Sequence, residues 1–158
     1  KNVAAREFNF QYAGEPENLA RLLAAHGWQE AEPANWRWTI LSMNPEPTEF
    51  TLPPLKRDYR GHADTLLLHR LGGDPSTQET IRIWDPGVRL NPGGQAVYLG
   101  QIASESLVQR MKVFSYWSAI PARQIHLDQL MGEAAGLQTR WGSSSFLLLK
   151  YLQASAGS

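Results

Sequence analysis

Strict alternation of apolar and polar residues opens the chain and predicts a half-buried β-strand. In EFNFQY, residues 7–12, the rings of Phe8, Phe10 and Tyr12 share one side and the polar residues share the other. Apolar runs with β-branched or aromatic residues, several of them bounded by turn residues, predict six further strands. These predicted strands cover residues 36–43, 63–71, 79–84, 95–102, 113–120 and 144–152.

A helical period replaces the alternation in two segments. Residues 16–26 carry apolar side chains at i, i+3 and i+4, with Pro16 in the first turn and Gly27 as a stop signal. A second helix is predicted over residues 122–135. The turn-forming segments are GGDPS at 72–76, NPGG at 91–94 and the proline-rich loop at 44–55.

The order of these elements is strand, helix, five strands, helix and strand. Grouped strands with few helices favour an α+β fold over a parallel doubly wound sheet. We therefore expect a mainly antiparallel mixed sheet of about six to seven strands with two helices packed on it. A single domain is expected over residues 1–152, followed by a flexible tail at 153–158.

Composition narrows the class of protein. The charges of fifteen basic and fifteen acidic side chains cancel, so the chain has no overall positive charge that would favour binding of nucleic acid. The absence of cysteine excludes disulfides and thiolate chemistry. The longest strongly apolar run, FLLLKYL at 146–152, is far shorter than the roughly 20 residues of a membrane span. Because the chain begins at Lys1 without a signal-peptide pattern, we expect a soluble domain excised from a longer protein.

The stretch YRGHADTLLLHR, residues 59–70, gathers most of the candidate chemistry. His62 and His69 are seven residues apart, so in an extended chain they face opposite sides about 23 Å apart. They cannot share a metal unless His62 lies in a turn that folds back. Arg70 and Arg82 lie on neighbouring predicted strands, where they could frame an anion site with Arg60 and Lys56. The alternative is that the arginines form structural ion pairs or stack on tryptophan rings. The candidate ligand- or anion-binding residues are Arg60, His62, Asp64, His69, Arg70 and Arg82.

The motif IRIW raises a narrower question about Arg82. Burial of Ile81 and Ile83 on one face leaves Arg82 and Trp84 on the other, where a guanidinium must be solvated, paired or stacked. We expect Arg82 to pack beside an aromatic ring or a carboxylate, with Trp84 and Asp64 as first candidates.

Known catalytic motifs are missing from the sequence. It has no GxSxG elbow, no phosphate-binding loop and no HExxH pair, and TRWGSSS at 139–145 is interpreted as a turn into the last strand. We therefore predict no catalytic residues, no metal and no cofactor.

Five segments resemble the LssY C-terminal domain family. In order they are FNFQYAG, LLAAHGW, LPPLKRDYRGHADTLLL, IRIW and AVYLGQI, spread over residues 8 to 120. The chain departs from the family pattern at His62, where arginine is common, and at Tyr98, where tryptophan is frequent. The resemblance implies a soluble tail of a bacterial inner-membrane protein of the DedA or type 2 phosphatidic acid phosphatase kind. It also implies an association with type I secretion and no established catalytic set.

Three functional hypotheses follow. The first is a non-catalytic accessory domain on the cytoplasmic side of the inner membrane, which binds its own transmembrane segments or another membrane protein. The second is an enzyme, or a domain that binds an anionic small molecule or a lipid headgroup, in the region of Arg60, His69 and Arg82. The third is a purely structural or assembly module, which would expose an apolar patch or a sheet edge.

Overall fold

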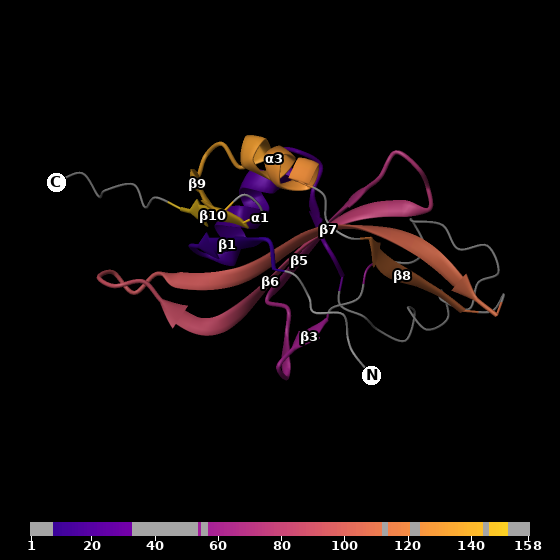
Figure 1. Ribbon diagram of the computed structural model, residues 1–158, viewed down its shortest axis with the longest axis horizontal. Helices are drawn as coiled ribbons and strands as arrows, with labels where there is room; N and C mark the ends of the chain where they lie inside the picture. Colours follow the sequence, from indigo (N-terminus) through magenta and orange to yellow (C-terminus); the bar gives the residue numbers. More distant parts are fainter. Residues whose placement is uncertain are drawn as a thin grey trace.

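The computed structural model describes residues 8–32, 54, 57–111, 114–120, 124–143 and 146–151. Its elements are β1 Phe10–Ala13, α1 Pro16–Ala24, β2 Gln29–Glu30, β3 Asp58–Tyr59, β4 His62–Ala63, β5 Leu66–Leu71, β6 Thr77–Arg89, β7 Ala96–Arg110, β8 Phe114–Ile120, α3 Gln124–Glu133, β9 Gln138–Ser143 and β10 Phe146–Lys150. Both helices lie on one face of a β-sheet, and the β3–β4 hairpin lies on the other (Figure 1). We call these the helix face and the hairpin face.

The sheet is mixed but mainly antiparallel, as the sequence predicts. Within the described residues eight strands belong to it, in the order β2-β5-β6-β7-β1-β10-β9, and β8 pairs with β7. The parallel pairing is that of β1 with β10. The predicted number of six to seven strands is close, and the prediction of an α+β fold with two helices is confirmed.

The long strand β7 borders two strands along the same side. Its first half pairs with β1 and its second half with β8. The side chain of Asn9 fills the fork between them, because its amide donates to the carbonyl of Ile102 and its oxygen accepts from the N–H of Ile102, both at 2.9 Å. A buried polar side chain thus replaces the backbone partners that Ile102 lacks there.

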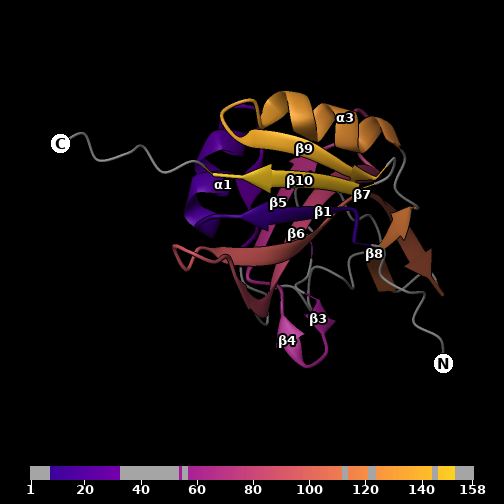
Figure 2. The same cartoon turned by 60° about the vertical axis from the view of Figure 1, so that its left-hand side comes forward.

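The main core lies between the helices and the helix face (Figure 2). Leu19 and Leu23 of α1 are fully buried there, and Leu130 of α3 is buried beside them. They pack in one cluster with Ile81 and Ile83 of β6. The apolar residues at helical spacing in the predicted helices 16–26 and 122–135 therefore form the surface that packs both helices on the sheet.

One glycine allows a close approach inside this core. Gly100 of β7 pairs with Phe10 of β1, and a Cβ at Gly100 would overlap the Phe10 ring. Phe10 is fully buried. The Phe10 ring thus occupies the space that a side chain at position 100 would fill.

Several predicted strands have different bounds in the structure. The predicted strand 63–71 is broken, because β4 ends at Ala63 and β5 begins at Leu66. The predicted strand 79–84 continues to Arg89, because β6 passes through a register shift between Trp84 and Val88 and pairs with β7 again beyond it. The predicted strand 95–102 likewise continues to Arg110.

The interpretation of residues 139–145 as a turn is wrong for residues 139–143, and residues 144–145 lie outside the described part of the chain. Residues Gln138–Ser143 form β9, which pairs with β10. Polar side chains on this edge strand hide the apolar alternation that predicts strands. The predicted strand at 36–43 and nearly all of the loop at 44–55 lie outside the described residues.

Candidate functional site

The stretch 59–70 forms a tight hairpin followed by a strand. Tyr59 pairs with His62, and the two residues between them, Arg60 and Gly61, have φ angles of 51° and 83°. Positive φ at both positions defines a turn of type I′, which suits the twist of paired strands and favours glycine at the second position. The side chains of Arg60 and His62 are therefore exposed at the tip. Arg60 lies beside the Tyr59 ring, 5.4 Å from its centroid.

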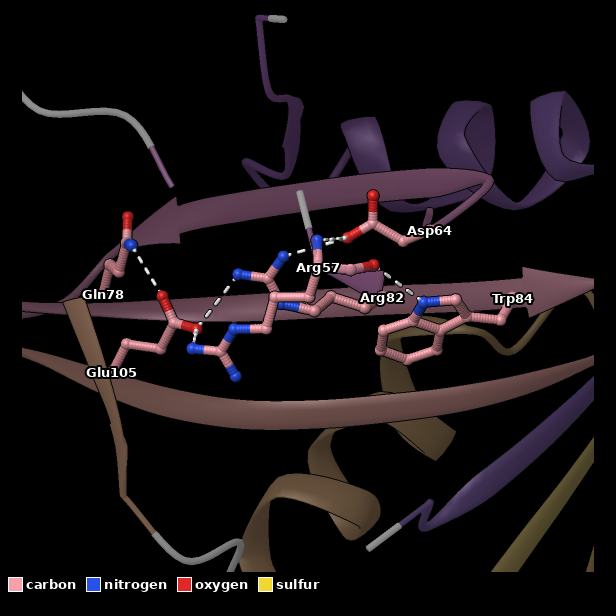
Figure 3. Close-up of polar contacts among 6 residues, drawn as sticks. All are labelled: Arg57, Asp64, Gln78, Arg82, Trp84 and Glu105. Carbon is pink, nitrogen blue, oxygen red and sulfur yellow. Dashed lines mark hydrogen bonds and ion pairs between the residues drawn. The ribbon is translucent and has the colours of Figure 1, made fainter. Parts of the chain in front are cut away.

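Directly under this hairpin lies a buried ionic cluster, the Arg82 cluster, shown in Figure 3. Its members are Arg57, Asp64, Gln78, Arg82 and Glu105. Arg82 projects from the hairpin face and is 1 % exposed. Its guanidinium donates to Asp64 Oδ2 at 3.0 Å and to Glu105 Oε1 at 3.1 Å. The prediction that Arg82 packs beside Asp64 is confirmed.

The remaining contacts of the cluster attach the hairpin to the sheet. Arg57 donates through Nη2 to Glu105 Oε1 at 2.8 Å and through its backbone N–H to Asp64 Oδ2 at 3.1 Å. Gln78 donates to Glu105 Oε2 at 3.0 Å. Two guanidiniums thus neutralise two carboxylates, which is the condition under which buried charges are tolerated.

Aromatic rings close the cluster on one side. Trp84 donates from Nε1 to the carbonyl of Arg57 at 3.0 Å. Phe8 packs edge-on against Trp84 and Tyr59, with ring centroids 5.5 Å and 4.8 Å away. Trp84 is 1 % exposed, so it shields this side of the ion pairs from water, which strengthens them and raises the cost of breaking them.

Arg70 lies on the opposite side of the sheet. The β5–β6 register pairs Arg70 with Glu79 but Arg82 with Leu67, so the two arginines face opposite ways. Their strands do pair as the anion-site hypothesis requires, but the two guanidiniums do not converge. Lys56, the fourth basic residue of that hypothesis, lies outside the described residues.

The partners of Arg70 join both helices to the sheet. Its guanidinium donates to Glu79 at 2.6 Å, to Glu133 at 2.7 Å and to the carbonyl of His26 at 2.9 Å, and it lies 4.5 Å from the Trp28 ring centroid. Burial alone would raise the pKa of Glu133, but hydrogen bonds from Arg70, Trp28 and a glutamine outweigh it and lower that pKa. Arg70 is thus both paired and stacked, as the structural alternative predicts.

The two histidines of the stretch lie on different elements. His62 is exposed on β4, whereas His69 is half-buried on β5, facing the same side as Arg82. Burial lowers the pKa of His69, and the nearby Glu105 charge opposes part of that effect. No three His, Asp or Glu residues gather in a metal-binding group in the part of the chain that the structure describes.

The depressed pKa of His69 predicts a pH dependence of stability. Histidine in the unfolded chain has an ordinary pKa of 6.5 and takes up a proton at a higher pH than His69 of the folded protein does, so the free energy of unfolding should fall as the pH drops below about 6.5. In His69→Gln this part of the decrease should be lost. Urea unfolding of both proteins between about pH 7 and pH 5 measures the difference. Parallel curves would contradict the burial of a neutral imidazole.

Sequence reasoning missed Arg57, Gln78 and Glu105. Glu105 follows the predicted strand end at residue 102, so no expected register placed it opposite Gln78. A weak signal was available, because Ala103 and Leu107 flank Glu105 at the two-residue spacing of a strand. Arg57 directly precedes β3, and it reaches the cluster because the β3–β4 hairpin packs on the sheet, which is a tertiary feature.

Fold and cluster together define an α+β domain whose buried charges are paired internally. Residues 2–120 match the model of the family described as LssY C-terminus, and the chain belongs to this family. The matched segment contains both the β3–β4 hairpin and the whole Arg82 cluster; α3, β9 and β10 follow it. No curated protein and no solved structure matches the chain. In the described residues no helix is long and apolar enough to cross a membrane.

Proposed function

We propose that this chain is a non-catalytic accessory domain of a bacterial inner-membrane protein of the DedA or type 2 phosphatidic acid phosphatase kind. It acts by binding, on the cytoplasmic side, either the transmembrane segments of its own protein or another membrane protein. The family assignment motivates the membrane context. The observation that carries the non-catalytic part is the internal pairing of the charged residues on which an enzyme mechanism would depend.

A catalytic acid, base or cation must reach its substrate. Arg82 is 1 % exposed and Glu105 is fully buried, and they are paired with each other. Reaching either of them would require breaking ion pairs in a site closed by aromatic rings, which costs several kcal/mol. The pairing therefore supports a structural role for the Arg82 cluster.

A competing function remains for the hairpin tip. Arg60 and His62 are exposed there and free to meet solvent, so an anionic molecule or a lipid headgroup could contact them. Two exposed side chains on a turn give weak binding, because solvent screens their charge. The substitution pair Arg60→Ala with His62→Ala isolates this possibility without touching the buried cluster.

The assay is turnover of p-nitrophenyl phosphate and p-nitrophenyl butyrate by the purified domain. We expect rates indistinguishable from buffer for the wild type. Robust turnover that is abolished by His69→Ala would contradict the proposal, provided that this variant still melts cooperatively.

The Arg60→Ala/His62→Ala double variant provides the matched measurement of binding. We expect inorganic phosphate to change its melting temperature and that of the wild type equally. Loss of a phosphate-dependent shift in the double variant alone would favour the anion-binding function instead.

A further inference from the structure

The end of the β7–β8 pair extends beyond the rest of the sheet. The last residue pair between β6 and β7 is Thr77 with Ser106. β7 continues four residues further, to Arg110, which pairs with Phe114 of β8. This two-stranded extension, the β7–β8 ribbon, reaches the right-hand end of the molecule in Figure 1.

Exposed apolar side chains concentrate on this ribbon and on the rest of β8. In the part of the chain that the structure describes, six large hydrophobic residues are exposed, and four of them lie on β8 or the turn before it. These four are Met111 at 83 %, Phe114 at 52 %, Tyr116 at 42 % and Ile120 at 37 % exposed. Phe114, Tyr116 and Ile120 share one face of β8, because their positions differ by even numbers. Such clustering marks an interaction surface.

The charge of the same segment has a single sign. Between Glu105 and Asp128 the sequence contains no acidic residue, but it contains Arg110, Lys112 and Arg123. The whole chain is neutral, so this segment stands out from the rest. Basic residues beside exposed aromatic and aliphatic side chains are the combination that binds anionic lipid surfaces.

We propose that the β7–β8 ribbon docks on the surface of an anionic lipid bilayer. Met111 and Phe114 enter the interface, Tyr116 lies at the level of the headgroups, and Arg110 contacts lipid phosphates. A protein partner suits the ribbon less well, because its tip offers fewer residues than the roughly 20 to 30 on each side of a standard protein interface. This inference deepens the proposed function and rests on it for the presence of a bilayer beside the domain.

The test is sedimentation of the purified domain with lipid vesicles. We expect vesicles of phosphatidylcholine with about 30 % phosphatidylglycerol to bind the wild type about tenfold more strongly than pure phosphatidylcholine vesicles do, and raised salt to weaken this binding. Met111→Ser combined with Phe114→Ser should weaken binding to the anionic vesicles by about tenfold. Arg110→Gln should weaken binding to the anionic vesicles only.

Val88→Ser is the matched control. Val88 is 51 % exposed and pairs with Val97, near the opposite end of β7. The Val88→Ser variant should bind vesicles like the wild type. All the variants of this test should have melting temperatures within about 2 °C of that of the wild type, because the replaced side chains are exposed.

Three results would overturn the inference. They are no binding to anionic vesicles, equal binding to neutral and anionic vesicles, and unchanged binding by the Met111/Phe114 double variant. Self-association of the wild type in analytical ultracentrifugation, lost in the double variant, would also overturn it by assigning the ribbon to a second copy of the chain. None of these results alters the turnover assay, so the proposed function is tested separately.

Discussion

Replacing Arg82 with methionine should lower the free energy of unfolding by about 3 to 5 kcal/mol. Methionine keeps most of the length of the side chain but removes the charge that Asp64 and Glu105 share at 3.0 Å and 3.1 Å. Glu105 would keep its ion pair with Arg57, but Asp64 would lose a buried charged partner. Urea unfolding at pH 7, analysed by linear extrapolation, measures the loss.

Arg89→Met is the matched control for this prediction. Arg89 also pairs with an aspartate, Asp85, at 3.1 Å, but their side chains are 47 % and 35 % exposed. Solvent screens such a pair, so this variant should lose less than about 1 kcal/mol. Similar losses of unfolding free energy in the two variants would show that burial does not determine how much the Arg82 cluster contributes to stability.

Substituting Gly100 with alanine should destabilise the protein by about 1 to 3 kcal/mol, although alanine is ordinarily the more favourable residue in regular structure. The new methyl group would overlap the Phe10 ring, which is fully buried. The ring must leave its position, or β1 must move away from β7. Thermal and urea unfolding would both register the strain.

Gly132 of α3 offers the opposite expectation. A Cβ at Gly132 meets nothing within 4 Å, so Gly132→Ala should stabilise the protein by about 0.5 to 1 kcal/mol through helix propensity. A stabilising effect at both glycines would contradict the close packing of Phe10 on Gly100.

The pairing of Arg82 could be predicted from the sequence because it follows from local periodicity. Ile81 and Ile83 identify the buried face of their strand, so an arginine between them must find a partner on the other face. Asp64 was the expected carboxylate, and it is one of the two that Arg82 contacts. The amphipathic period of residues 16–26 likewise predicted α1 and its packing.

Features that depend on register could not be predicted in this way. The separation of Arg70 from Arg82 follows from which residues β5 and β6 place opposite each other, and a shift by one residue would reverse it. Glu105 and Arg57 join the cluster through segments whose approach is set by tertiary packing. Short strands such as β3 and β4, two residues each, are too brief to show any alternation.

Thermal melting of the wild type and Arg82→Met, each with and without inorganic phosphate, tests most directly the claim that the Arg82 cluster is structural. We predict that the variant melts about 10 °C lower than the wild type. Phosphate should then change the two melting temperatures by the same amount, because Arg82 is buried and already paired with Asp64 and Glu105. A variant that melts like the wild type and loses a phosphate-dependent stabilisation would contradict the account and assign Arg82 to an anion site.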